Sequence, residues 1–426
     1  MRFFVFAATL AASCLPVQAW SQVQPQTAVS RLISSTKFRA AAGHLRADHE
    51  RLVAEIIRIT EIPAPPFGEG PRALAYADMM RASGLRDVSV DAIGNVIGVR
   101  PGADRALPPL IVAAHLDTVF PKETDVTVRR QGTRLMAPGI GDDSRGTAVL
   151  LAFIRALDSA GIVTDRDILF IGNVGEEGPG DLRGMRHLFG NDPRAKRAAA
   201  FITVDSSGAE QIVTRGVGSR RYHVVFEGPG GHSFDKFGIV NPAAALARAV
   251  TGLYAIPVPS DPKTTYSASI LAGGTSVNTI PASVSVDIDI RSVAAAEVAR
   301  VDAAFKAVAQ RAVDEENAAR STERGTVRVR FEQIGDRPAG RTDENDALAR
   351  TAHAASAAFG YAPRFIAVST DANVAMSLGI PAIAIGSGGS GGYEHSPDEY
   401  IDVEIGESVR GMSVGLATIL GVAGSR

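Results

Sequence analysis

Residues 110–117 read Leu-Ile-Val-Ala-Ala-His-Leu-Asp, an apolar run that ends in a histidine and an aspartate. A run without polar alternation is typical of a strand that is buried on both faces, as in a parallel sheet covered by helices. His115 and Asp117 then lie at or just beyond the carboxyl end of this strand, the edge at which open α/β sheets bind their ligands. The stretch therefore predicts an α/β fold with a parallel sheet covered by helices, and a ligand site at the carboxyl end of this strand.

Further strands of the same kind follow along the chain. Residues 168–174, 201–204 and 382–385 are short apolar runs, and residues 147–157 and 347–359 have apolar side chains at helical spacing. Strands that alternate with helices indicate an α/β fold with a mostly parallel sheet and helices on both faces.

The pattern changes near residue 216. Alternating strands and amphipathic helices follow in the order strand-helix-strand-strand-helix-strand, over residues 220–226, 242–254, 265–271, 284–291, 294–319 and 327–334. This order predicts a ferredoxin-like α+β domain inserted into the catalytic domain. We expect a catalytic domain over residues 22–215 and 336–426, the inserted domain over residues 216–335, and a signal peptide over residues 1–21.

Composition limits the classes of partner and of metal site. The 426 residues include 44 Lys and Arg against 46 Asp and Glu, so the net charge of −2 offers no basic face for nucleic acid. The only cysteine is Cys14, which lies in the first apolar segment. Disulfides, thiolate zinc sites and a cysteine nucleophile are therefore not expected, and His, Asp and Glu must supply any metal ligands.

The first 22 residues have the layout of a secretory signal peptide. One arginine precedes the apolar run Phe3–Leu15, and Val17-Gln18-Ala19 offers a cleavage site with small residues. The run is shorter than the roughly 20 residues that span a bilayer, and no later segment reaches that length. We expect a secreted protein, periplasmic in a Gram-negative host, and the alternative is a lipoprotein acylated at Cys14.

Acidic side chains and histidines gather at the predicted strand ends. They are His115, Asp117, Asp142, Asp143, Glu176, Glu177, Asp205 and His395. Carboxylates a few ångströms apart repel one another, and divalent cations remove that repulsion. Two histidines with several carboxylates suit a pair of Zn²⁺ ions, with Co²⁺ or Mn²⁺ as alternatives, for metal-assisted hydrolysis. Of the adjacent Glu176 and Glu177, one can bind metal while the other stays uncoordinated as general base.

At these motifs the sequence resembles the di-zinc metallopeptidase family of peptidase T, carnosinase, carboxypeptidase G, aminoacylase and succinyl-diaminopimelate desuccinylase, over nearly all of the mature chain. The resemblance implies five metal ligands: His115, Asp142, Glu177, Asp205 and His395. His115 and Asp205 would bind one ion, Glu177 and His395 the other, and Asp142 would bridge them.

The same resemblance implies further roles. Asp117 would orient His115, and Glu176 would be the general base. His232, in the segment Gly230-Gly231-His232-Ser233, would reach the active site of the partner in a homodimer and stabilise the oxyanion. Asn278 and Arg291 would bind the substrate, and the inserted domain would form the dimer interface. One departure is that Ser144-Arg145 follows the aspartate pair where the family usually has lysine, so contacts around the metal ligands are expected to differ locally.

The residue type at one of these implied ligands, Asp205, bears on the substrate. In the family this ligand is typically Asp in aminopeptidases and dipeptidases, and Glu in carboxypeptidases and acylases; here it is Asp205. The first hypothesis is therefore a secreted di-zinc exopeptidase that hydrolyses short peptides with a free amino end. The second is an amidohydrolase that deacylates N-acyl or N-carbamoyl amino acids on the same metals. The third is a non-catalytic binding or scaffolding protein whose metal site has decayed.

Overall fold

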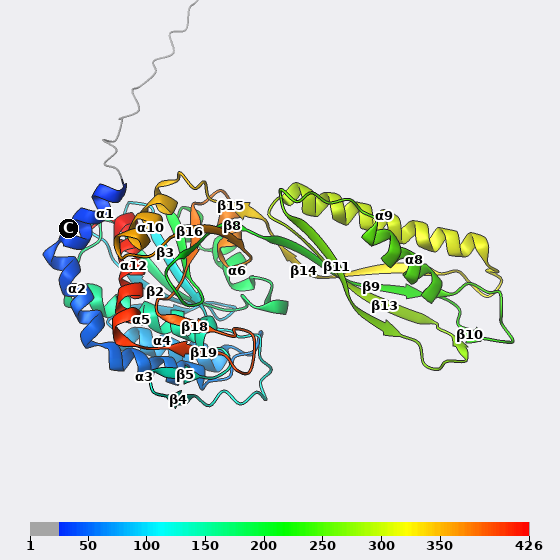
Figure 1. Ribbon diagram of the computed structural model, residues 1–426, viewed down its shortest axis with the longest axis horizontal. Helices are drawn as coiled ribbons and strands as arrows, with labels where there is room; N and C mark the ends of the chain where they lie inside the picture. Colours follow the sequence, from blue (N-terminus) through cyan, green and yellow to red (C-terminus); the bar gives the residue numbers. More distant parts are fainter. Residues whose placement is uncertain (1–24, 426) are drawn as a thin grey trace, which may run out of the picture.

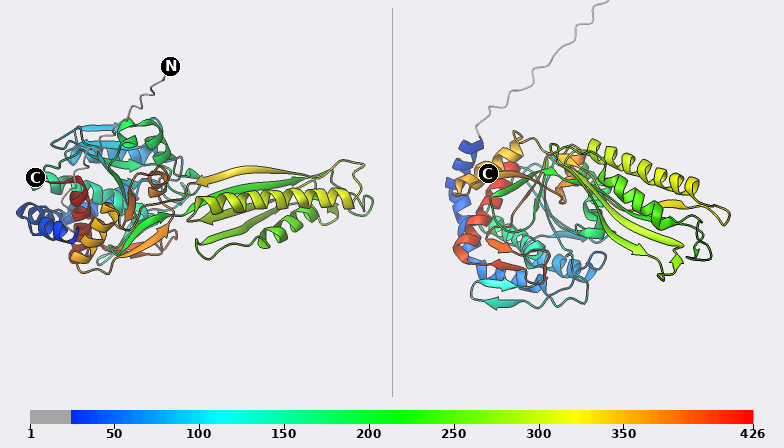
Figure 2. Two further views of the ribbon diagram at one scale, coloured as in Figure 1. Left: turned by 90° about the horizontal axis from the view of Figure 1, so that it is seen from above. Right: turned by 45° about the vertical axis from the view of Figure 1, so that its right-hand side comes forward.

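The computed structural model describes residues 25–425, which form two lobes (Figure 1). The large lobe comprises residues 25–216 and 340–425, and the small lobe comprises residues 218–337. The small lobe extends from one side of the large lobe as an elongated arm, which is clear from a second direction in Figure 2. The predicted signal peptide, with Cys14, lies outside the described residues.

The large lobe is built on a nine-stranded sheet. Its strands are β1 (Asp87–Val90), β2 (Val96–Arg100), β3 (Leu110–His115), β6 (Ile168–Asn173), β7 (Ala200–Val204), β8 (Gln211–Gly216), β15 (Gly340–Arg341), β16 (Arg364–Val368) and β17 (Ala382–Ile385). Its helices are α1 (Pro25–Ser34), α2 (Thr36–Ala47), α3 (His49–Thr60), α4 (Gly70–Ala82), α5 (Arg145–Ser159), α6 (Arg183–Asn191), α7 (Pro193–Lys196), α10 (Ala347–Ala358), α11 (Ala372–Ser377) and α12 (Ile405–Ala423).

The sheet is mixed, and the prediction of a mostly parallel sheet is wrong in that respect. The order is β1-β2-β6-β3-β7-β17-β8-β15, with β16 beside β8. The central strands β6, β3, β7 and β17 are parallel, whereas β1, β2, β8 and β15 pair antiparallel with their neighbours along this order. A tight turn joins β1 to β2, and so short a connection permits only antiparallel pairing.

Helices cover both faces of the sheet, as predicted. Successive side chains of a strand point to opposite faces, so Leu110, Val112 and Ala114 of β3 enter a core with α5 and α12. Ile111 and Ala113 enter a second core with α6 and α11. Every residue of β3 is buried, which explains the uninterrupted apolar run in the sequence.

The small lobe contains a four-stranded antiparallel sheet and two helices. Its elements are β9 (Gly218–Glu227), β10 (Gly231–His232), α8 (Pro242–Tyr254), β11 (Thr264–Gly273), β12 (Thr279–Ile280), β13 (Ser283–Ser292), α9 (Ala295–Ala319) and β14 (Arg328–Arg337). The sheet order β11-β13-β9-β14 and the element order match the predicted ferredoxin-like arrangement. Val286, Ile288 and Ile290 of β13 are buried in its core with α8 and α9. The exact domain boundaries and the role in dimerisation remain predictions.

Other parts of the large lobe were not predicted. A second small sheet joins β4 (Arg129–Gln131), β5 (Arg134–Met136), β18 (Ser390–Gly392) and β19 (Tyr400–Asp402). The glycine-rich run at residues 386–392 ends in β18. Helix α12 is buried along nearly its whole length against the central sheet. Among residues 25–425, no helix is long and apolar enough to cross a membrane.

Candidate metal centre and active site

Three parallel strands bring the central side chains together. Because β6, β3 and β7 are neighbours and run in the same direction, their carboxyl ends share one edge of the sheet. His115 is the last residue of β3, Glu176 and Glu177 follow β6 closely, and Asp205 directly follows β7. The predicted juxtaposition of these segments is therefore observed.

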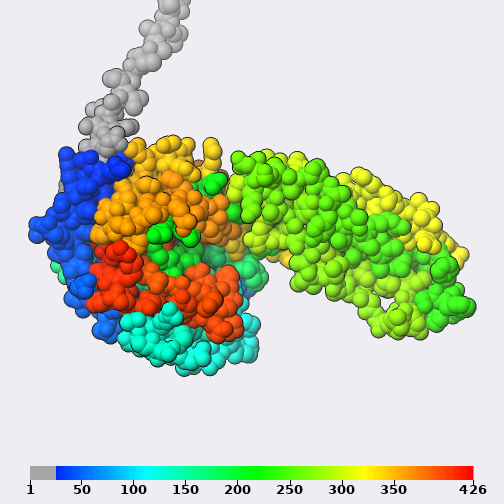
Figure 3. All heavy atoms as spheres, viewed as in Figure 1, coloured from blue at the N-terminus to red at the C-terminus, as the bar shows by residue number. Residues whose placement is uncertain are grey.

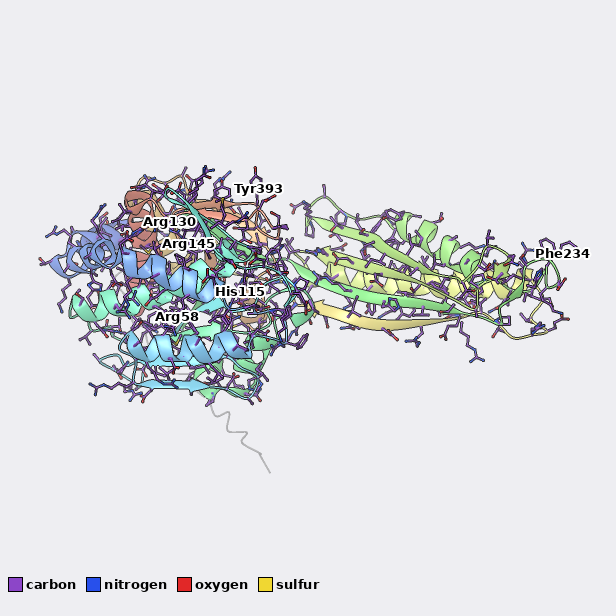
Figure 4. The ribbon with its side chains drawn as sticks, turned by 90° about the horizontal axis from the view of Figure 1, so that it is seen from below. Arg58, His115, Arg130, Arg145, Phe234 and Tyr393 are labelled. Carbon is purple, nitrogen blue, oxygen red and sulfur yellow. The ribbon has the colours of Figure 1, made fainter. Side chains whose placement is uncertain are left out.

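Asp142 lies between the two histidines. His115 Nε2 is 2.8 Å from Asp142 Oδ1, and His395 Nε2 is 3.0 Å from Asp142 Oδ2. Asp142 comes from the turn before α5, and His395 from the segment between β18 and β19. Figure 4 places His115 inside the large lobe, on the side toward the small lobe. One carboxylate thus has an oxygen toward each imidazole, which is the arrangement of a bridging ligand.

Two further carboxylates flank this pair. Glu177 Oε1 lies 3.0 Å from His395 Nε2, and Asp205 Oδ1 lies 3.9 Å from His115 Nε2. The donor atoms of His115, Asp142 and Asp205 all lie within 4.8 Å of one another, and so do those of Asp142, Glu177 and His395. These two groups contain the five residues for which the sequence resemblance implies metal binding, and Asp142 belongs to both.

The pKa values in the cluster reflect its crowded negative charge. Burial, and then the neighbouring Asp142, raise the pKa of the Asp205 carboxyl to about 7. Hydrogen bonds to Asp142 and Glu177 raise the pKa of His395 to about 11. Burial alone would lower the pKa of His115, but the hydrogen bond and charge of Asp142 raise it well above its usual value. Positive charge at the centre of the cluster would therefore stabilise the ionised carboxylates.

Divalent cations fit this donor set. The ligands are imidazole nitrogens and carboxylate oxygens, which suit Zn²⁺, Co²⁺ and Mn²⁺. Asp142 offers one oxygen to each half of the cluster, so two ions can share it. The chemistry of these side chains is therefore that of a candidate site for divalent cations.

Asp117 has a different contact from the expected one. It is the backbone carbonyl of Asp117 that lies 3.0 Å from His115 Nδ1, whereas its carboxylate is 3.8 Å away. The two carboxylate oxygens instead accept the backbone N–H groups of Glu176 and Glu177, at 3.0 and 2.8 Å. Asp117 thus orients the glutamate pair with its side chain and the histidine with its backbone.

Glu176 is distinguished from Glu177 by an arginine. Arg337 Nη1 lies 3.1 Å from Glu176 Oε1, and Arg337 Nη2 donates to the backbone carbonyl of Glu176. Both side chains are buried. A carboxylate oxygen of Glu176 also lies within 4.8 Å of possible ligand atoms of His115 and Glu177. Glu176, however, forms an ion pair with Arg337, whereas Glu177 contacts His395. Glu176 therefore lies beside the candidate metal ligands and has a cationic partner of its own.

Two buried carboxylates that sequence reasoning did not assign hold the backbone of the site. Asp143 accepts the N–H groups of His115 and Gly146, at 3.2 and 3.1 Å. Glu399 accepts N–H groups of residues 139, 141 and 142, at 2.9, 2.7 and 3.0 Å. Both side chains are fully buried, so they fix the β3 end and the Asp142 turn rather than meet a substrate.

Arg145, from the Ser144-Arg145 pair that differs from the usual family pattern, lies in the interior of the large lobe. Arg145 is fully buried, and its guanidinium donates to the backbone carbonyl of Asp402 at 3.3 Å and to Ser408 Oγ at 3.1 Å. A side chain on Gly389 would collide with this guanidinium, so the glycine-rich segment packs directly on it. Arg145 therefore supports the segment that leads to His395 and makes no contact with the ligand cluster itself.

A cavity of about 580 Å³ opens onto the cluster. Its lining includes Asp142, Glu176, Glu177, Asp205 and His395 from the large lobe, and Arg221, Arg291 and Arg337 from the small lobe. In the space-filling view an open notch separates the two lobes below their junction (Figure 3). Arg291, for which the sequence resemblance implies a substrate-binding role, lines this cavity. Arg221, Arg337 and Glu394 are lining residues that the sequence analysis did not identify.

His232 and Asn278 are not brought to the cluster of their own chain. Strand β10, which contains His232, pairs with β12 at the end of the small lobe farthest from the large lobe. Figure 4 labels Phe234, two residues beyond His232, at this same far end. Ser233 N donates to the carbonyl of Asn278 at 2.9 Å, so the two predicted residues lie close to each other. Their predicted roles require a second copy of the chain.

The missed residues left little signal in the sequence. Arg337 lies in Asp336-Arg337-Pro338, at the return from the small lobe, and nothing in its neighbours indicates a buried ion pair. Glu399 follows His395 by four residues in a polar segment typical of a surface loop. Only its proximity to a predicted ligand could have drawn attention to it.

A family model, described as peptidase family M20/M25/M40, matches residues 111–420. Among curated proteins, a peptidase T-like protein of Rhizobium meliloti (strain 1021) is 47% identical over 62 residues, 15% of this chain and 15% of its own length. An N-carbamoyl-L-amino-acid amidohydrolase of Paenarthrobacter aurescens is 30% identical over 151 residues, 33% of this chain and 32% of its own length. Each match thus spans less than two thirds of the relative.

Solved structures share the fold. Aminopeptidase PepT from Bacillus cereus ATCC 10987 has a TM-score of 0.71 at 23% identity, over 88% of this chain and 99% of its own. A hydantoinase/carbamoylase family amidase from Burkholderia ambifaria has a TM-score of 0.60 at 22% identity, over 89% and 98%. With the family match over most of the described residues, these findings lead to one conclusion. The chain belongs to peptidase family M20/M25/M40 and is a hydrolase of that family.

Proposed function

We propose that this protein is a di-zinc exopeptidase that hydrolyses short peptides with a free amino end. The observation that carries the proposal is the position of Asp142, which has one oxygen toward His115 and the other toward His395. The roles of Glu177 and Asp205 as the remaining ligands rest on their place beside these histidines.

The chain's own residues perform the proton transfers in this proposal. Divalent cations in the cluster would polarise the scissile carbonyl and activate a water molecule for attack. The Glu176 carboxylate accepts a proton from that water and then donates it to the departing amine nitrogen. Arg337 and the Asp117-bound backbone hold Glu176 in position for both transfers.

The small lobe supplies recognition of the substrate. Arg291 lines the cavity, and its Nε lies 2.7 Å from Asp289 Oδ2, which fixes the guanidinium in place. A fixed arginine fork suits a carboxylate, such as the free carboxyl end of a short peptide. The cavity volume of about 580 Å³ also suits a small substrate.

We further propose a homodimer in which His232 and Asn278 serve the site of the partner. His232 is exposed, and so are the apolar side chains of Phe234 and Phe237 beside it. Ile270 and Leu271 are exposed on β11, which is an edge strand of the small-lobe sheet. Exposed apolar side chains on an edge strand suit contact with a second copy. In the dimer, His232 would stabilise the negative oxygen of the tetrahedral intermediate.

The second candidate is an amidohydrolase that acts on N-carbamoyl or N-acyl amino acids. The similarity to the Paenarthrobacter amidohydrolase favours it, because that match is longer than the match to the peptidase T-like protein. Both reactions would use the same ligands and the same base. A carbamoyl or acyl substrate lacks the ammonium group of a peptide, and this difference separates the candidates.

A substrate panel tests the proposal directly. Metal-loaded protein is assayed on di- and tripeptides and on N-acetyl and N-carbamoyl amino acids, beside a Glu176→Gln variant. The exopeptidase proposal expects hydrolysis of the free peptides and a fall of about 10²–10⁴ in kcat for the variant. Turnover of the acylated compounds alone would support the amidohydrolase. Export of the protein, which we infer from residues 1–22, is tested by amino-terminal sequencing of the mature protein.

A further inference from the structure

Most of the carboxylates that line the cavity over the cluster already have a proposed role or an ion-pair partner. Asp142, Glu177 and Asp205 are the proposed metal ligands, and Glu176 is paired with Arg337. Among the residues that line the cavity, Glu394 is the one remaining carboxylate. No cation within residues 25–425 forms an ion pair with Glu394, whereas its neighbour His395 faces Asp142 and Glu177.

Glu394 is an exposed residue whose side chain contacts Ser206 beside one half of the cluster. Ser206 Oγ donates to Glu394 Oε2 at 3.3 Å and also lies 3.3 Å from Asp205 Oδ1. Glu394 therefore lies on the flank of the cluster that Asp205 occupies. The backbone of Ser206, Tyr393 and His395 has positive φ, from 58° to 63°, a conformation that non-glycine residues rarely adopt. Such conformations persist where the surrounding structure fixes them, and they are frequent in ligand-binding segments.

The other flank of the cluster is cationic. Arg337 contacts Glu176, and its side chain is only 6% exposed, with Nε lacking a hydrogen-bond partner among the described residues. Arg221 and Arg291 share the single carboxylate of Asp289, at 3.3 and 2.7 Å. Two guanidinium groups with one carboxylate leave a net positive charge at this wall of the cavity. The cavity is thus bipolar, with an unpaired carboxylate beside Asp205 and excess arginine beside Glu176.

A second cavity adjoins the carboxylate end. It measures about 450 Å³ and shares Ser206 and Glu394 with the active-site cavity. Its lining contains Glu210 and Glu407 and no lysine or arginine. Glu394 therefore lies on the wall between the scissile-bond region and a space that can receive a further side chain.

We propose that Glu394 binds the free α-ammonium group of the substrate and makes the enzyme selective for an unblocked amino end. The inference rests on the proposed exopeptidase function and names the residue that would give it this substrate class. The ammonium lies against Glu394, the carboxyl end lies against Arg291 and Arg221, and the scissile carbonyl lies between them at the metal ligands. The side chain of the amino-terminal residue extends into the adjoining cavity.

Binding measurements test the inference separately from turnover. Zinc-loaded protein with Glu176→Gln, which keeps peptides intact, is titrated with trialanine and with N-acetyl-trialanine in a calorimeter. The same titrations are made after adding Glu394→Gln, and after adding Asp398→Asn, an exposed acid of the same segment outside both cavities. Metal content is measured for each variant to exclude loss of ions.

We expect the parent to bind trialanine at least about tenfold more tightly than N-acetyl-trialanine, as a charged hydrogen bond provides. Glu394→Gln should abolish this preference by weakening the binding of trialanine while leaving the binding of N-acetyl-trialanine unchanged. Asp398→Asn should keep the preference. A parent that does not prefer the free amine, or a preference that survives Glu394→Gln, overturns the inference. Failure of wild-type protein to hydrolyse trialanine would reject the exopeptidase proposal, while the binding preference would still decide the role of Glu394.

Discussion

Arg337, at the last position of β14, forms a buried ion pair with Glu176, which follows β6 in the other lobe. The distance from Nη1 to Oε1 is 3.1 Å, and a second nitrogen donates to the backbone carbonyl of Glu176. The small lobe therefore contributes directly to the position of the proposed general base. The relative position of the two lobes and the geometry of the base are linked through this one side chain.

Replacing Arg337 by methionine should lower kcat by about ten- to a hundredfold, because Glu176 loses its charged hydrogen bonds. KM should change less, since the substrate contacts of Arg291 remain. Steady-state kinetics on a hydrolysed peptide measure both constants. Arg328→Met, an exposed position on the same strand, is the control. An unchanged kcat in Arg337→Met would mean that the ion pair does not position the base.

Asp117→Asn should weaken metal binding by about ten- to a hundredfold. The carboxylate accepts the N–H groups of both Glu176 and Glu177, and an amide offers only one acceptor oxygen in its place. Competition with a chelator of known affinity measures the change. If the affinity were equal to that of wild type, the glutamate pair would not depend on Asp117 for its orientation.

Arg145→Met should destabilise the fold by about 1–3 kcal/mol, because the carbonyl of Asp402 and the hydroxyl of Ser408 lose a buried donor. Chemical denaturation followed by circular dichroism gives the free energy of unfolding. Arg134→Met, near Asp402 but largely exposed, should change it much less. Equal effects of the two substitutions would contradict the structural role of Arg145.

Mixing two inactive variants tests the proposed dimer. A homodimer of Glu176→Ala lacks the base, and a homodimer of His232→Ala lacks the partner's histidine. After subunit exchange, a mixed dimer regains one complete site, so equal mixing should restore about a quarter of the wild-type activity. No recovery, with exchange shown by differently tagged subunits, would place His232 outside the active site.

The sequence predicted several elements of both lobes well, where an apolar run or an apolar helix face is buried. The apolar run at residues 110–114 corresponds to β3, and the helix predicted at residues 242–254 corresponds to α8. The antiparallel pairing of β8 was not predicted, because this strand has mixed polarity and its partners β15 and β17 lie far along the chain. Helix α12 was also not identified, although its nearly continuous burial leaves it apolar on most sides.

The ligand cluster was predictable for a physical reason. Parallel neighbouring strands end at a common edge, so recognising the strands before His115, Glu177 and Asp205 was enough to predict that these residues share one edge of the sheet. Arg337 and Glu394 had no such constraint. Arg337 reaches the site from the other lobe, and Glu394 lies in a loop whose path depends on packing against Ser206.

The number of metal ions bound per chain decides whether Asp142 lies at the centre of a two-ion site. Protein stripped with chelator, reloaded with Zn²⁺ and freed of excess ion is measured by elemental mass spectrometry, beside Asp142→Ala. We expect two tightly bound ions per chain in the wild type and a loss of tight binding at both positions in the variant. One ion or none in the wild type, or two ions retained without Asp142, would contradict this expectation.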